Sequence, residues 1–114
     1  MEKNLAGDRK QIEGKLEYDC FSWEALEEVA KTFKEAKRKY GNNDSWRLSG
    51  TESIKVYQNA LQRHLIELHK GMPDTYTETI NGVDYHWRHS AQIIWNALAL
   101  CDKLLLKEKE EKGK

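Results

Sequence analysis

Two short polar segments interrupt apolar helical repeats, and their histidines are the first candidates for chemistry. One segment is Arg63-His64, and the other is His86-Trp87-Arg88-His89. Residues three or four apart share one face of a helix, so the surrounding repeats turn His64, His86 and His89 toward the face that carries Leu and Ile. A buried imidazole without a hydrogen-bond partner, metal or ligand costs about 1–3 kcal/mol. A binding site is therefore expected inside a helical bundle.

The same histidines belong to pairs that could chelate a divalent metal. His64 with Glu67, and His86 with His89, are spaced i, i+3, and Asp74 lies between the two pairs. Imidazole and carboxylate groups on neighbouring turns converge on one ion when two helices face each other. The sequence has no HExxH motif, however, and this favours the alternative that these are hydrogen-bonded core histidines.

A second metal hypothesis rests on Glu24, Glu27 and Glu28, which contain an ExxE pair. Helical nucleotide pyrophosphohydrolases begin their magnesium site in this way, but they add an ExxD pair on a following helix, because Mg²⁺ that bridges phosphates is held by carboxylates. No ExxD pair occurs in the second or third predicted helix. The outer face of an amphipathic helix is the favoured interpretation, and the metal candidates remain Glu24, Glu28, His64 and His89.

Basic residues beside aromatic residues point to a phosphate group and a stacked base. A base stacked on an aromatic ring contributes about 1–3 kcal/mol, and Trp46 or Tyr40 could supply that ring, although Trp46 could equally be a packing anchor. We expect Trp23 and Trp95 to pack in the interior. The predicted ligand-binding residues are Lys39, Tyr40, Trp46, Arg47, Arg63, His64, Asp74, His86, Arg88 and His89.

The elements that must position these residues are predicted to be three helices. Ser22 is the expected N-cap of the first helix, which ends at Gly41. Ser49 with Glu52 matches a capping box for the second, which runs to about Lys70 and ends at Gly71. Residues 71–83 form a long connection, expected to be a lid or arm over the site. The last helix is predicted from about 84 to 106.

The expected fold class is all-α: a small bundle of three main helices with a long loop between the second and third. Residues 1–14 form a flexible arm, 15–106 a single helical domain, and 107–114 a charged tail. The last helix is apolar on more than one side, and such a helix needs more than two neighbours. We therefore expect a homo-oligomer to complete the bundle.

Composition narrows the function classes. The 114 residues hold 19 basic and 19 acidic side chains, so no overall field draws the protein to a nucleic acid polymer or an acidic membrane. No segment approaches the roughly 20 apolar residues of a membrane span or the apolar core of a signal peptide. Cys20 and Cys101 have no CxxC spacing, and two reduced thiols are expected. A cytoplasmic location follows as the expectation.

The ordered pattern resembles a known phage and prophage domain. The run GKLEYDCFSWEALEEVAKTFKEAKRKYG is followed by Trp46, Arg63-His64, Gly71, Asp74, Gly82 and His86-x-x-His89-Ser90-Ala91 with a leucine-rich helix. This order is similar to the dATP/dGTP diphosphohydrolase N-terminal family over about residues 14–106. The family signature carries over onto Lys15, Tyr18, Lys39, Tyr40, Trp46, Arg63, His64, Asp74, His86 and His89. The chain departs from the family between Asp74 and His86, where it is longer and richer in Thr and Tyr.

The resemblance implies a viral protein concerned with nucleotides, in the cytoplasm of an infected or lysogenic bacterial host. In longer family members this region precedes a MazG-like nucleotide-hydrolysing part, which this sequence is expected to lack. Three hypotheses follow. The favoured one is a non-catalytic binder that sequesters a nucleotide or a cyclic or other nucleotide-derived immune signal, with no cofactor firmly implied. The second is a Mg²⁺-dependent dNTP pyrophosphohydrolase. The third is a protein–protein inhibitor of a host enzyme.

Overall fold

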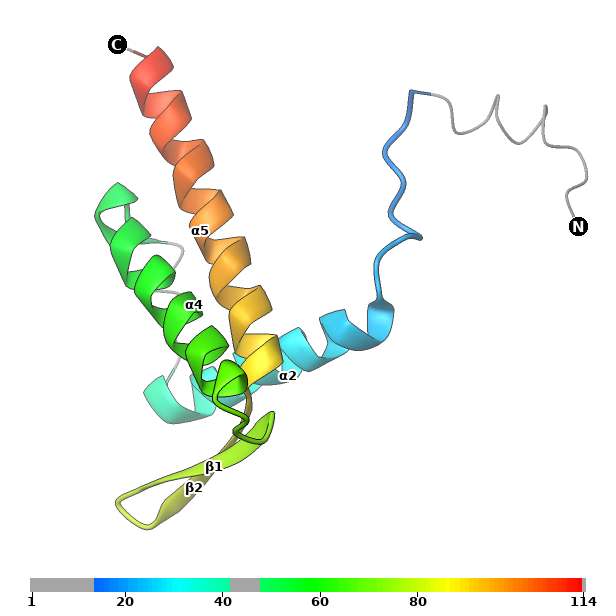
Figure 1. Cartoon of the computed structure of the whole chain (residues 1–114). Coiled ribbons are helices and arrows are strands. Elements are labelled where there is room, and N and C mark those ends of the chain that lie inside the picture. Colours follow the sequence, from blue (N-terminus) through cyan, green and yellow to red (C-terminus); the bar gives the residue numbers. More distant parts are fainter. Residues whose placement is uncertain (1–13, 42–47, 114) are drawn as a thin grey trace, which may run out of the picture.

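A computed structural model describes residues 14–41 and 48–113, which form three long helices and one β-hairpin. In chain order the elements are α2 (Trp23–Tyr40), the 3₁₀ turn η1 (Thr51–Ser53), α4 (Ile54–His69), β1 (Thr75–Ile80), β2 (Val83–Arg88) and α5 (His89–Lys112). Helices α4 and α5 lie side by side and run antiparallel (Figure 1). Helix α2 crosses this pair near the end of α4 and the start of α5, and the hairpin projects from the same end of the pair. The elements that carry the candidate residues therefore meet at one end of the helix pair.

The predicted start of the first helix and the predicted C-terminal ends of the first two helices are confirmed. The Ser22 hydroxyl accepts a hydrogen bond from the Ala25 backbone N–H at 3.1 Å, which satisfies one of the free donors at the start of α2. Gly41 follows α2 and Gly71 follows α4, both with positive φ. At the start of α4, η1 precedes the helix, and the Glu52 carboxylate accepts from the Gly50 N–H at 2.8 Å. The predicted capping box of Ser49 and Glu52 is therefore wrong: among the described residues no side chain caps η1 or α4, and the Ser49 hydroxyl donates to Ser53 Oγ at 3.2 Å.

The three predicted main helices are confirmed, but the fold is not all-α, because residues 75–88 form an antiparallel hairpin in place of a loop and a helical turn. Asn81 and Gly82 have φ of 51° and 79°, which is the geometry of a two-residue type I′ turn. On either side, Tyr76 and Glu78 lie opposite Trp87 and Tyr85, so side chains alternate with period two. The last helix consequently begins at His89, not near Asp84, and it continues to Lys112.

The core is small and centred on the crossing of the three helices. Its most buried side chains include Val29, Tyr57, Ala91 and Ala99. Trp95 packs between Phe33 and Tyr57, with ring centroids 6.1 and 5.7 Å away, as expected for a packing tryptophan. Trp23 does not behave as expected, because it is 63% exposed. None of the described helices is long and apolar enough to cross a membrane.

Candidate functional site

A pocket of about 330 Å³ lies where α2, α4, the hairpin and α5 meet. Each element contributes one side of it: the second half of α2, the middle of α4, the inward face of the hairpin and the first turns of α5. Its lining residues are Thr32, Phe33, Ala36, Lys37, Lys39, Tyr40, Arg63, His64, Tyr76, Glu78, Trp87, Gln92, Trp95 and Asn96. The volume falls in the range of small-molecule sites.

Two histidines meet beside this pocket. His64 Nδ1 lies 2.9 Å from His89 Nδ1, so one ring nitrogen donates and the other accepts. His89 is buried, and the Tyr76 ring stacks on it at 4.2 Å between centroids while the Tyr76 hydroxyl donates to Gln92 Oε1 at 2.7 Å. Burial lowers the pKa of His64, and charge on His89 and Arg63 acts in the same direction. The pocket therefore has a neutral, hydrogen-bonding imidazole wall at pH 7.

A cation and a carboxylate are joined on the opposite side of the pocket. Lys39 Nζ donates to Glu78 Oε1 at 2.8 Å, and Trp87 Nε1 donates to the same oxygen at 3.1 Å. The Lys39 ammonium also lies over the rings of Tyr40 and Trp87, at 4.9 and 5.7 Å from their centroids. The bond from Lys39 is the main reason that the pKa of Glu78 lies below its usual value. The rings of Tyr40 and Trp87 are therefore both held by contact with the Lys39 ammonium group.

The charges of the pocket do not cancel. Among the described residues, Lys37, Lys39 and Arg63 line it against one carboxylate, that of Glu78, so these four side chains carry an excess of two positive charges at pH 7. Lys39 is the partner of Glu78. Among residues 14–41 and 48–113, neither Lys37 nor Arg63 forms an ion pair with a carboxylate. The pocket is therefore suited to an anion with an aromatic group.

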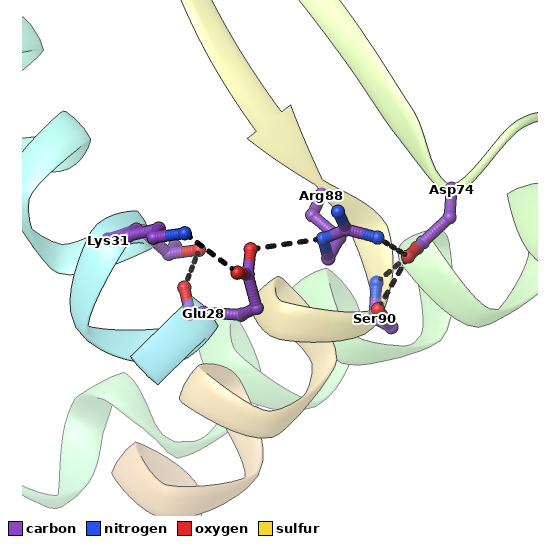
Figure 2. Close-up of polar contacts among 6 residues, drawn as sticks. Glu28, Lys31, Asp74, Arg88 and Ser90 are labelled. Atoms are coloured by element: carbon purple, nitrogen blue, oxygen red, sulfur yellow. Dashed lines mark hydrogen bonds and ion pairs between the residues drawn. The ribbon is translucent and has the colours of Figure 1, made fainter. Parts of the chain in front are cut away.

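Several other predicted site residues form a separate polar network, shown in Figure 2. The Asp74 carboxylate accepts from the Ser90 N–H at 2.8 Å, the Ser90 hydroxyl at 2.7 Å and Arg88 Nη1 at 2.9 Å. Arg88 Nε donates to Glu28 Oε1 at 3.2 Å, and Lys31 pairs with the other Glu28 oxygen at 2.9 Å. A carboxylate on the first N–H groups of a helix is favourable. This network joins α2, the hairpin and the start of α5.

Ionisation of Asp74 follows from this environment. Burial alone would raise the pKa of its carboxyl group, but the bonds from Ser90 and Arg88 outweigh burial and lower it. Asp74 is thus a stable carboxylate whose oxygens already have partners. Its position is that of a capping group for α5, and it does not line the pocket.

The remaining predictions divide in three ways. His86 lies in β2, where its Nδ1 is 3.3 Å from the Thr77 hydroxyl, so the predicted i, i+3 pair with His89 on one helix is wrong. Glu24 is exposed in the first turn of α2, outside the pocket. Trp46 and Arg47 lie outside the described residues. The pocket contains Lys39, Tyr40, Arg63 and His64 of the predicted set, with His89 directly behind His64.

The sequence-based prediction missed the pocket residues of the hairpin and of α5. Tyr76, Glu78 and Trp87 share one face of the hairpin, while Gln92 and Asn96 are one helical turn apart on α5. The alternation of Tyr76, Glu78, Tyr85 and Trp87 around Asn81-Gly82 is the signal that could have found the first three. Within the described parts of the chain, no three or more His, Cys, Asp or Glu side chains gather as metal ligands would.

Comparison with known proteins agrees with the sequence pattern. Residues 6–113 match the family described as dATP/dGTP diphosphohydrolase, N-terminal. No curated protein matches the chain, and no solved structure does. Since the family match covers nearly the whole sequence, the chain belongs to the dATP/dGTP diphosphohydrolase N-terminal family.

Proposed function

We propose that the protein is a viral nucleotide-binding protein, which holds a nucleotide or a nucleotide-derived immune signal in the pocket between α2, α4, α5 and the hairpin. The observation that carries the proposal is the excess of two positive charges among the described lining residues of an aromatic-walled pocket. Family membership supports a nucleotide as the class of ligand. On this proposal a phage or prophage protein removes the ligand from the host cytoplasm by mass action.

The two ends of a nucleotide would meet different parts of the pocket. Arg63 and Lys37 are the cations of the described pocket lining that form no ion pair with a described carboxylate, and a guanidinium binds phosphate through two parallel hydrogen bonds. The exposed ring of Tyr40, which lines the pocket, would stack on the base. Amide and imidazole groups of Gln92, Asn96 and His64 can hydrogen-bond to its polar edge.

The carboxylates favour binding over hydrolysis. Attack on an α-phosphorus through Mg²⁺ requires carboxylate oxygens that can turn to the ion. Glu78 is the single carboxylate among the lining residues, and it accepts from Lys39 and Trp87. Glu28 and Asp74 are engaged with Arg88. The alternative, a Mg²⁺-dependent dNTP pyrophosphohydrolase, draws its support from the family description and would have to use Glu24 or Glu28.

The deciding experiment is to incubate the protein with dNTPs, cyclic di- and trinucleotides and ADP-ribose derivatives, with Mg²⁺, Mn²⁺ or EDTA. The protein is then removed, heat-denatured, and the released compounds are separated by chromatography. We expect one compound to be depleted by the protein and to return unchanged, with or without EDTA. Appearance of dNMP only with a metal would replace the proposal by the hydrolase, and depletion of no compound would overturn both.

Arg63 provides the matched test of the site. Arg63→Gln should weaken binding of the retained compound about ten- to a hundredfold, because a hydrogen bond to a charged group contributes about 1.5–3 kcal/mol. Lys70→Gln removes one positive charge from the exposed end of the same helix, outside the pocket. Calorimetric titration should show little change for this control. Equal losses in both variants would mean that net charge, and not the pocket, binds the ligand.

A further inference from the structure

The two edges of the hairpin differ in what covers them. On the β2 edge, the His86 N–H donates to Glu35 Oε2 at 2.6 Å, and the Asp84 carbonyl accepts a hydrogen bond from the Arg38 guanidinium. Both partners belong to α2, so this helix covers two of the backbone groups of β2 that point away from β1. In the described parts of the chain, α2 packs against β2, and no helix packs against β1 to a comparable extent.

The register identifies the backbone groups at the β1 edge. In an antiparallel pair, residues alternate between those that bond to the partner strand and those whose N–H and C=O point away from it. Asp84 and His86 point away from β1, so their partners Thr79 and Thr77 point away from β2, and Thr75 follows by the same alternation. All three threonines are exposed. In the described parts of the chain, no hydrogen bond reaches their N–H or C=O groups from outside the hairpin.

We propose that this edge pairs with β1 of a second copy of the chain, which gives a two-fold dimer with a continuous four-stranded sheet. An unpaired strand edge is a template for another strand, and a two-stranded hairpin alone is marginally stable in water. The dyad passes beside Thr77, so Thr77 bonds to the partner subunit's Thr77. Thr75 and Thr79 then bond to the partner subunit's Thr79 and Thr75.

Self-complementarity of the strand selects this register and a second copy as the occupant. Centring the dyad on Glu78 would place two carboxylates opposite each other, and like charges in that position are destabilising. Centring it on Tyr76 would place Thr79 opposite the partner subunit's Pro73, which has no N–H to donate. The Thr77-centred register uses all three outward-facing residues and sets Glu78 opposite the partner subunit's Tyr76.

The dimer has a consequence for the pocket. Cross-strand neighbours point to the same side of a sheet, so Tyr76 and Glu78 of both copies would lie on one face. Both residues line the pocket. The two ligand sites would therefore open beside each other across the dyad, with a residue of each copy next to the site of the other.

Sedimentation equilibrium of the full chain at micromolar concentration tests the proposal. The wild type should have twice the 13.4 kDa mass of the chain. Thr77→Pro removes the central N–H of the open edge without removing a hydrogen bond inside the hairpin, and it should be monomeric. Thr77→Val keeps the N–H and should remain dimeric. A wild type that stays monomeric, or a Thr77→Pro protein that stays dimeric, would overturn the proposal.

If circular dichroism shows that the proline variant is unfolded, a second measurement tests the same strand edge. Thr77→Cys, with the exposed Cys20 and Cys101 changed to Ser, should give a covalent dimer with a short bis-maleimide. Thr77→Cys that yields no covalent dimer contradicts the proposed edge. Leu105→Glu alters an apolar residue of α5 that is 54% exposed, far along the chain from the hairpin. Dissociation by Leu105→Glu with a dimeric Thr77→Pro would assign self-association to the helices instead.

Discussion

At the scale of single residues, the contacts of His64 in the pocket wall determine how readily it binds a proton. His64 contributes to the pocket wall, while His89 is buried beneath Tyr76 and meets His64 at 2.9 Å. The charges of His89 and Arg63 disfavour protonation of His64, whereas the charge of Glu67 favours it. With burial, the net effect lowers the pKa of His64, so the folded protein resists a proton that the unfolded chain accepts.

This difference predicts a pH-dependent stability. As the pH falls through 6.5, the ordinary value for histidine, the unfolded chain binds a proton first, and stability decreases until the lower pKa of folded His64 is reached. Urea unfolding at pH 7.5 and 5.5 should show a smaller free energy of unfolding at pH 5.5. His64→Gln should reduce this difference, whereas His69→Gln, at an exposed position, should keep it. An unchanged difference in His64→Gln would contradict this assignment.

At the scale of elements, the hairpin is the part that most shapes the pocket. It supplies Tyr76, Glu78 and Trp87 to the lining, and its β2 edge is held by α2 through Glu35 and Arg38. The hydrogen bond from Arg38 is the main cause that lowers the pKa of Glu35 to about 2, so Glu35 remains a carboxylate well below neutral pH.

Gly82→Ala tests the hairpin as a unit. Gly82 has φ of 79°, and a Cβ there would meet no atom within 4 Å, so the cost of alanine is the backbone conformation alone. A left-handed conformation costs an L-residue about 1–2 kcal/mol. We expect a loss of this size in urea unfolding, together with weaker ligand binding. Gly113→Ala is the control: Gly113 follows α5 at a negative φ, so its replacement should change neither stability nor ligand affinity. Full ligand affinity in Gly82→Ala would show that the hairpin does not contribute to ligand binding.

At the scale of the whole molecule, one buried lysine ties the far end of the helix pair together. Lys103 is 1% exposed, and its ammonium group donates to the Ser49 carbonyl at 2.7 Å and lies 3.5 Å from the Asp102 carboxylate. The contact holds the segment before α4 against α5, at the end opposite the pocket. The core of this part of the molecule is small, because apolar side chains such as Leu98 and Leu105 are exposed and not buried.

Lys103→Met should therefore destabilise the protein by about 1–3 kcal/mol, because the Ser49 carbonyl loses a charged donor in a buried position. Chemical denaturation measures the change, with Lys107→Met as the exposed control on the same helix. Ligand affinity should not change, since neither residue lines the pocket. Replacement of a buried charge by an apolar residue can stabilise a protein, and that result would show that the ammonium group is retained for another reason.

Local patterns in the sequence were enough to predict some features of this protein. The Ser22 cap, Gly41, Gly71 and the helical spacing of apolar residues define α2 and α4, because hydrogen bonds within a helix depend on neighbouring residues alone. The same spacing turned His64 and His89 toward the interior, where the structure places both. The order of motifs also indicated the family.

Other features depend on contacts between distant parts of the chain. Residues 84–88 fit a helical repeat and a strand equally well, and pairing with 75–79 across the Asn81-Gly82 turn decides for the strand. That choice moves His86 away from the pocket and brings Glu78 to Lys39, 39 positions away. It also joins Asp74 and Arg88 to Glu28. The spacing of apolar residues in the sequence predicts which residues share a face of a helix or strand. The packing of these elements against one another determines which residue each charged side chain contacts.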